Sequence, residues 1–226
     1  MSPVTHFLIG WSVACLAPLG NRERAVVAAA AVAPDLDGLG AIAEIATKNS
    51  DQPALWFSEY HHVLGHNIGA ALVVMAVAFL IAKRRSLTAF LAGLSFHLHR
   101  LGDIIGGRGP DGYDWPIPYL LPFSDSWQIS WNGQWALNAW PNFLATGIAL
   151  GFTMYFAWKH GSSPLEIVSP RANAVFVQTL RDRFGEPPEE KLAHRFKSEV
   201  QHAPNRGVSA DCDPRERGSR PLNTDR

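Results

Sequence analysis

The first 160 residues consist largely of apolar segments that carry histidine and aspartate side chains inside them or at their ends. A charge that faces lipid is costly, so ionisable residues in such segments usually serve a buried site. The pattern rests on five of the nine histidines and three aspartates: His61, His62, His66, His97, His99, Asp35, Asp37 and Asp103. It favours a fold in which apolar helices bring these side chains together.

Composition divides the 226 residues into two regions. Residues 1–160 are rich in Ala, Leu, Val, Phe and Trp, which predicts a membrane-embedded helical domain. Residues 161–226 are rich in Arg, Glu, Asp, Pro and Ser, which predicts a cytoplasmic tail. In that tail Ala174–Phe184 and Glu189–Val200 are expected to form short helices, followed by disorder. The formal net charge of zero gives no reason to expect a nucleic-acid partner, and two cysteines predict no disulfide framework.

Five apolar segments predict an all-α fold, a polytopic bundle of about five transmembrane helices. Ile68–Ala82, extended by Val63–Asn67, reaches the roughly 20 residues that a spanning helix needs. Phe143–Trp158 is similar, and three further segments contain polar residues: Val4–Leu19, Ala25–Ala46 and Leu87–Ile105. Several segments are short and Pro34 interrupts one of them, so a soluble helical bundle is the alternative.

Lysine and arginine residues predict the orientation of this bundle. They occur in the turn Asn21–Arg24, at Lys83–Arg85 and after Trp158, and the positive-inside rule places all three on the cytoplasmic side. The N-terminus then lies outside and the tail inside. The same topology brings most of the candidate ligands to the outer side of an inner (plasma) membrane.

The segment Gly106–Pro141 is expected to be an outer loop, and it holds five of the eight tryptophans: Trp115, Trp127, Trp131, Trp135 and Trp140. Tryptophan favours the membrane–water interface, so this loop is expected to anchor on the outer leaflet or to cap the site. Asn132-Gly133, between Trp127–Trp131 and Gln134–Leu137, predicts a tight β-hairpin.

His99 and Asp103 lie four residues apart in an apolar segment, so a helix places both on one face. Such a pair can bind one ion, or the aspartate can orient the histidine. His62 and His66 have the same spacing, whereas His61 could reach the same centre from a preceding loop. Spacing alone does not choose between His61 and His62. Imidazole and carboxylate ligands in this mixture suit zinc or a similar divalent ion.

Asp35 and Asp37 follow Pro34, which interrupts the helical hydrogen bonds and lets the backbone turn both carboxylates toward one centre. The two aspartates could instead cap a helix that starts after the break. Two carboxylates at membrane depth are costly without a cation, which favours ligation. His6, at the start of the first apolar segment, is a further candidate ligand.

In this order, the motifs resemble the membrane-bound metal-dependent hydrolases grouped as the LexA-binding, inner-membrane-associated family. The matching stretches are Thr5-His6, Pro34-Asp35-Leu36-Asp37, His61 through His66, His99 through Asp103, and Gly112 through Pro122-Phe123. The resemblance covers residues 1–160 and implies a metal-dependent hydrolase of the inner membrane.

The ligand order is also similar, more distantly, to zinc-dependent phospholipase C. That resemblance implies one zinc ion on Asp35, His61 or His66, His99 and Asp103, with His6 near a second. This chain has His61-His62-Val63-Leu64-Gly65-His66-Asn67 where the hydrolase pattern reads His-Arg-Gly-x-Thr-His-Ser, and no His-x-x-x-Glu follows Asp103. One or two ions, of zinc or manganese, are therefore expected rather than three.

These observations predict an enzyme that hydrolyses a phosphoester in a membrane lipid or a lipid-linked molecule. The predicted metal ligands are His6, Asp35, His61, His66, His99 and Asp103. Asp37 or His62 is expected to act as the general base or to orient a ligand, and the outer-loop tryptophans are expected to contact the substrate.

Two non-catalytic functions are alternatives. A haem-binding protein could use His66 and His99 as axial ligands, although carboxylates prefer harder cations. An ion-passage or scaffold protein could use the same intramembrane residues while its tail binds a cytoplasmic protein partner.

Overall fold

The structure is a computed structural model that describes residues 1–109, 112 and 115–188. One compact unit runs from Met1 to Pro187, and the second, Pro188–Arg226, lies outside the described residues apart from its first member. The predicted helix Glu189–Val200 therefore falls outside them.

The first unit is mostly helical, which confirms the predicted all-α class. Its elements are α1 (Pro3–Cys15), α2 (Asn21–Ala30), η1 (Ala33–Leu39), α3 (Gly40–Thr47), α4 (Trp56–Tyr60), α5 (Ile68–Ile81), α6 (Arg85–Gly106), β1 (Ile117–Pro118), β2 (Gln128–Ile129), α7 (Trp140–His160), η2 (Pro164–Ile167) and α8 (Pro170–Phe184).

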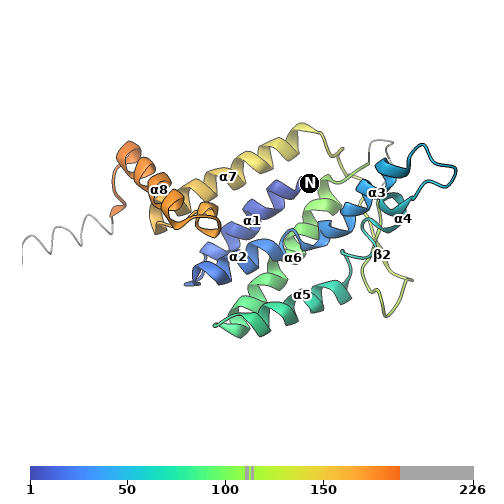
Figure 1. Cartoon of the computed structure of the whole chain (residues 1–226), viewed down its shortest axis with the longest axis horizontal. Helices are drawn as coiled ribbons and strands as arrows, with labels where there is room; N and C mark the ends of the chain where they lie inside the picture. The colour runs from blue at the N-terminus through green and yellow to red at the C-terminus, as the bar shows by residue number, and fades with distance from the viewer. Residues whose placement is uncertain (110–111, 113–114, 189–226) are drawn as a thin grey trace, which may run out of the picture. The chain divides into compact units, whose positions relative to one another are not determined.

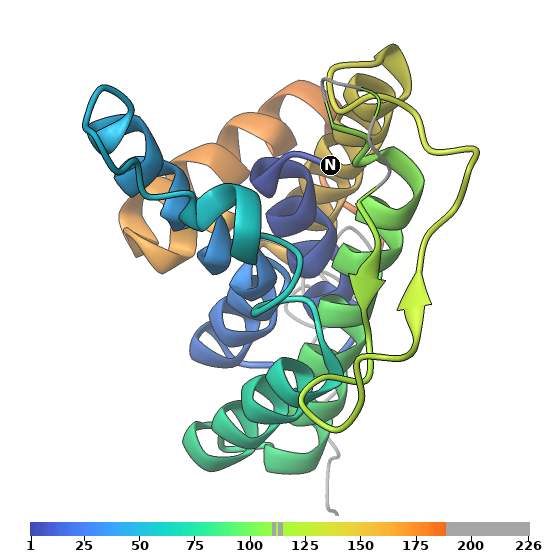
Figure 2. The same ribbon diagram turned by 90° about the vertical axis from the view of Figure 1, so that its right-hand side faces the viewer.

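Helix α6 contacts α1, α2 and α5, while α7 packs on the far side of α1 (Figures 1 and 2). Alanines fill the contact between α2, α5 and α6, where Ala30, Ala78 and Ala92 are buried together. Their small side chains let three helices approach closely. A second cluster around Val27 and Leu91 joins α1, α2 and α6. The core therefore fixes the helices whose ends carry the candidate ligands.

Helix α5 begins later than the sequence predicts. Asn67 caps it: its Oδ1 accepts from the Ala70 amide over 2.8 Å, and its Nδ2 donates to the carbonyls of Val63 and Leu64. An asparagine at this position ends the helical hydrogen-bond pattern on its N-terminal side. The predicted extension Val63–Asn67 is therefore wrong, and α5 has 14 residues.

The predicted segment Ala25–Ala46 is broken into α2, η1 and α3. Pro34 lies at the start of η1, and the two halves of the segment bend by 54°. In the described part of the chain, this bent pair is the one segment with the length and hydropathy to cross a membrane, and no helix taken singly has both.

The predicted hairpin at Asn132-Gly133 is wrong. The short strand β2 pairs antiparallel with β1 on its N-terminal side, and the residues after the Asn132-Gly133 turn bond to the end of α6 instead. The Trp135 amide donates to the Ile105 carbonyl over 3.1 Å, and Gln134 Nε2 donates to the Asp103 carbonyl over 2.9 Å. These tertiary hydrogen bonds take the groups that a local hairpin would have used.

Three basic turns lie at the same end of the bundle. The Arg84 amide, in the turn before α6, donates to Glu23 Oε1 on α2 over 2.6 Å. Arg24 pairs with Glu166 of η2 over 2.7 Å, close to the end of α7. Because α1, α2, α5 and α6 alternate in direction, the start of α1, the turn η1, the start of α5 and the end of α6 meet at the opposite end (Figure 2).

Candidate metal centre

Helix α6 supplies two of the candidate ligands. His99 and Asp103 lie one turn apart on its buried face and are 1% and 3% exposed. Gly102 lies beside them, and a Cβ there would stand only 3.0 Å from the His6 ring. A small residue at this position lets α1 lie directly against the ligand-bearing face of α6.

Asp35 in η1 and His66 before α5 supply the other two ligands. The two segments approach so closely that a Cβ on Gly65 would lie 2.1 Å from the Pro34 carbonyl oxygen. Only glycine allows that contact without moving one backbone away from the other. The approach also places Asp37 beside His66. The helix break at Pro34 and the glycine at position 65 therefore both contribute to bringing the two segments together.

Four side chains meet at this point: Asp35, His66, His99 and Asp103. One ligand atom from each can be chosen so that all four lie within 4.8 Å of one another. His99 Nε2 is 2.8 Å from Asp103 Oδ2, 3.1 Å from His66 Nε2 and 3.6 Å from Asp35 Oδ1. The structure thus brings together residues from three segments that are up to 68 positions apart in sequence.

Hydrogen bonds on the far side of each imidazole determine what faces the centre. His99 Nδ1 lies 2.7 Å from the Ala31 carbonyl, which can only accept, so Nδ1 carries the hydrogen. His66 Nδ1 lies 3.2 Å from the Asp37 carboxylate and is a donor for the same reason. In their neutral forms both rings therefore present an Nε2 lone pair to the centre.

With both rings neutral, the atoms that face the centre are therefore all hydrogen-bond acceptors. Asp35 Oδ2 is buried and has no hydrogen-bond partner among the described residues, and Asp103 Oδ2 lies 2.8 Å from His99 Nε2 and 3.4 Å from His66 Nε2. Two imidazole lone pairs and two carboxylates that face one another repel unless a cation lies between them. Two nitrogens and two carboxylate oxygens suit a borderline divalent ion such as zinc. These residues therefore fit a metal ion, and the cluster could hold one.

Asp37 lies behind the cluster. Its Oδ2 accepts from the Gly65 amide over 2.9 Å and from His66, while its Oδ1 is 2.8 Å from His61 Nδ1. With three partners around it, this carboxylate orients His66 and His61. The sequence left open whether Asp37 serves as a base or orients a ligand, and this geometry favours the second role.

His6 and His61 were predicted as ligands, and neither is among the four grouped side chains. His6 Nε2 lies 3.1 Å from Asp103 Oδ1, and its ring lies over that of His99 with centroids 3.7 Å apart. The amino group of Met1 contacts the same Asp103 oxygen. These contacts orient Asp103 from the side opposite the cluster.

A cavity of about 360 Å³ opens beside the cluster. Asp35 and Asp103 lie on its wall together with His61, His62 and Trp115. His62 has a φ of +68°, a left-handed conformation that is unusual outside glycine and brings its ring against that of His66. Burial lowers the pKa of His62 to about 2, so its imidazole is uncharged at neutral pH.

Sequence reasoning missed several participants in this site. The Ala31 carbonyl and the Met1 amino group are main-chain groups, so the side chains of these two residues give no indication of their role. Phe57 stacks on His61 with ring centroids 4.6 Å apart, and Trp115 meets the same ring edge-on. The tryptophan content of the outer loop pointed to Trp115 in general terms, whereas nothing in the sequence singled out Phe57.

The fold and the site define a helical protein whose buried carboxylate–imidazole cluster could hold a metal ion. The family described as YdjM inner membrane protein matches residues 1–180, and the chain belongs to this family. The description places the family in the inner membrane, as predicted, and names no reaction. No curated protein and no solved structure matches the chain.

Proposed function

We propose that this protein is a membrane-embedded metal-dependent hydrolase that cleaves a phosphoester in a lipid or a lipid-linked molecule. The observation that carries the proposal is the convergence of Asp35, His66, His99 and Asp103, with ligand atoms within 4.8 Å of one another. Zinc is the proposed ion and manganese the alternative, because both accept nitrogen and oxygen ligands. The site faces the extracytoplasmic side, and the tail lies in the cytoplasm, where it can bind a protein partner.

These four residues would hold the ion, which would supply Lewis acidity toward a phosphoryl oxygen. Asp37 keeps His66 in the tautomer that directs Nε2 at the centre. His6 and the Met1 amino group hold Asp103 Oδ1, so that Oδ2 is directed toward the other ligands. His66, His99 and Asp103 are thus each held by a partner outside the cluster, as the ligands of a preorganised metal site are.

His61 is the residue that we assign as general base. Its Nδ1 is engaged by the buried carboxylate of Asp37 at 2.8 Å, and its ring forms part of the cavity wall. This pairing fixes the ring and leaves Nε2 as the atom that accepts a proton from water. His62 lines the same cavity but its lowered pKa makes it a weaker base, so it serves to shape the cavity.

The cavity wall supports a lipid-linked substrate rather than a small soluble one. Leu39, Phe57, Trp115 and Leu137 line it beside the charged cluster. Leu39 is 60% exposed and Leu137 48% exposed, so the mouth of the cavity is apolar. A phosphoester would meet the ligands while its hydrophobic part contacts this rim.

Haem is a poor fit to the same residues. Axial ligands bind opposite faces of a porphyrin, about 4 Å apart with the iron between them if each bond is near 2 Å. His66 Nε2 and His99 Nε2 are 3.1 Å apart, with Asp103 close to both. The two nitrogens are therefore closer together than two axial ligands of one iron would be.

The test measures metal content and hydrolysis together. Protein purified in detergent should contain about one equivalent of zinc or manganese and release phosphate-containing product from a phospholipid or a chromogenic phosphodiester. Asp103→Ala should remove the metal and the activity. His61→Ala should keep the metal and lose at least 100-fold in kcat, in the range of general-base catalysis.

Asp51→Ala provides a matched control, because Asp51 is exposed and belongs neither to the cluster nor to the wall of the cavity beside it. If Asp103→Ala contained as much metal as the wild type, the proposal would be wrong. It would also be wrong if metal-loaded wild-type protein hydrolysed no phosphoester.

A further inference from the structure

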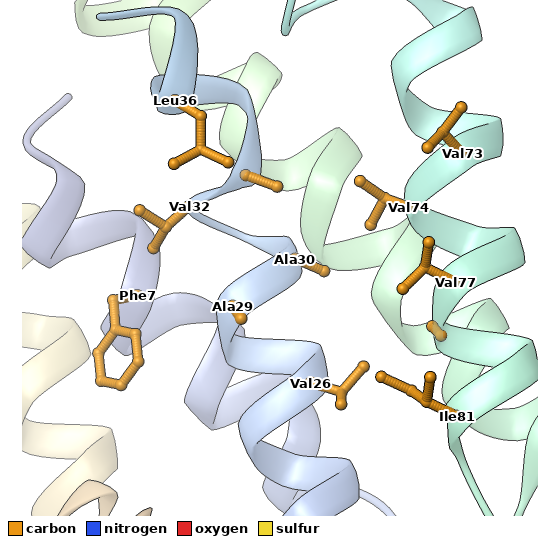
Figure 3. Close-up of a pocket in the computed structure, with 12 residues that line it drawn as sticks. Phe7, Val26, Ala29, Ala30, Val32, Leu36, Val73, Val74, Val77 and Ile81 are labelled. Carbon is orange, nitrogen blue, oxygen red and sulfur yellow. The ribbon is translucent and has the colours of Figure 1, made fainter. Parts of the chain in front are cut away.

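A second cavity of about 570 Å³ lies between α2 and α5, and its wall is entirely apolar. Figure 3 shows Val26, Ala29 and Ala30 of α2 facing Val73, Val74, Val77 and Ile81 of α5, with Phe7 of α1 to one side. We call it the α2–α5 groove. We propose that the α2–α5 groove binds one acyl chain of a membrane lipid, and, on the basis of the function proposed above, that this lipid is the substrate.

The groove reaches the turn that carries the metal ligand Asp35. Leu36 closes one end of the groove in Figure 3, whereas Val26 and Ile81 lie at the other end. Leu36 is 63% exposed, while Asp35 and Asp37 on either side of it contact the histidines of the cluster. A chain lying in the groove therefore ends one residue away from the ligands.

The groove is nearly as long as the stretch of hydrocarbon that one bilayer leaflet contributes. Its α5 wall runs from Val73 to Ile81, eight helical steps and so roughly 12 Å along the helix. The hydrocarbon core of a bilayer is about 30 Å thick, so one leaflet contributes about 15 Å. The end at Ile81 adjoins the basic turn Lys83–Arg85, and the end at Leu36 adjoins the site. A lipid whose acyl chain lies in the groove would thus have its head group at the cluster.

The size of the groove favours an acyl chain over a helix from another copy. A helix with its side chains is about 10 Å across, so a 12 Å length of it occupies roughly 900 Å³. The groove offers about 570 Å³. The outer face of α5 is also apolar, with Leu72 51% and Leu80 71% exposed, so lipid can enter from the side. An acyl chain fits both observations.

The experiment uses the full chain in nanodiscs that contain a phosphatidylglycerol with a diazirine near the end of one acyl chain. Illumination should crosslink this lipid to α2 and α5, with Val26, Val74 and Val77 among the labelled positions in a peptide map. Ala29→Trp places an indole in the groove at an exposed position of α2 and should reduce the labelling at least fivefold.

Ala76→Trp is the matched control, because Ala76 is an exposed alanine of α5 outside the groove. It should change the labelling less than twofold. Val26→Phe is a second way to fill the groove if Ala29→Trp fails to fold by circular dichroism. Labelling spread evenly over α5, labelling that neither groove substitution reduces, or crosslinks between two copies of the chain at these positions would overturn the inference.

Metal content separates this proposal from the proposed function. Ala29→Trp leaves all four ligands intact and should keep its metal while losing activity on phospholipid more than on a short soluble phosphodiester. Wild-type protein that labels in the groove but contains no metal would overturn the hydrolase and leave the lipid site standing. Metal-loaded, active protein without groove labelling would overturn the lipid site alone.

Discussion

His99 donates its Nδ1 hydrogen to the Ala31 carbonyl across 2.7 Å, and this bond fixes which nitrogen faces the metal centre. His97, two residues earlier on α6, bonds instead to the Gly93 carbonyl of its own helix and lies on another face. The two imidazole rings therefore point in different directions from the same helix.

We therefore predict that alanine substitutions of these two histidines have different effects on metal binding. His99→Ala should abolish metal binding, because it removes one of four ligands and the ring that positions the lone pair. His97→Ala should keep the metal within a factor of two. Elemental analysis of both purified variants checks the prediction, and equal metal loss in the two would contradict it.

Chelation should destabilise the protein. A ligand that binds only the folded state at 100 times its dissociation constant contributes about 2.7 kcal/mol. For a unit of this size such a contribution corresponds to roughly 5–10 °C in Tm. EDTA should lower the Tm by this amount, and zinc or manganese should restore it. Asp103→Ala should show no response to either reagent, which distinguishes binding at the cluster from binding elsewhere.

Asp37→Asn should weaken the metal site without removing a ligand. Asp37 accepts from His66 and His61, and a carboxamide offers only one acceptor oxygen to these two donors. The loss of such an outer partner costs about 10- to 100-fold in metal affinity or activity. Competition with a chromogenic chelator measures the affinity. An affinity equal to that of the wild type would show that Asp37 does not orient His66.

The sequence was enough to place the pair on α6. Apolar composition located the helix as Leu87–Ile105 against the observed Arg85–Gly106, and the spacing of four put His99 and Asp103 on one face. Both inferences depend only on residues that are close in sequence, where helix geometry determines direction.

The choice between His61, His62 and His66 could not be made in the same way. The three residues lie in a turn whose path depends on Asn67 as a cap and on the contact between Gly65 and Pro34. Those are tertiary contacts, so spacing carries no information about them. The predicted hairpin at Asn132-Gly133 failed for a related reason, because hydrogen bonds to the end of α6 replaced the local pairing.

Gly65→Ala should test whether that close contact builds the site. The added methyl would lie 2.1 Å from the Pro34 carbonyl oxygen and 3.0 Å from Asp37 Oδ2, so the two segments must separate. We expect a loss of about 1–3 kcal/mol in the free energy of unfolding, as for overpacked cores, together with weaker metal binding. Gly151→Ala on α7 is the control, since nothing lies within 4 Å of its Cβ and helix propensity favours alanine by up to about 1 kcal/mol. Similar stabilities for the two variants would argue against the contact.

Glu23→Gln should test the opposite end of the bundle through its pH dependence. Glu23 accepts from the Arg84 and Gly20 amides over 2.6 and 2.9 Å, and these hydrogen bonds lower the pKa of its carboxyl. Its stabilising contribution is therefore full above the unfolded pKa of about 4.3 and is lost as the pH falls through the lower folded value. The glutamine variant leaves one of the two backbone amides without a good acceptor, so its free energy of unfolding at pH 7 should be lower by about 1–2 kcal/mol. Because glutamine does not titrate, the variant should lose less stability than the wild type between pH 5 and about 3. Thermal melts across this pH range measure both effects, with the exposed Glu59→Gln as the control. Parallel pH profiles for Glu23→Gln and the wild type would show that this carboxylate does not tie α2 to the turn before α6.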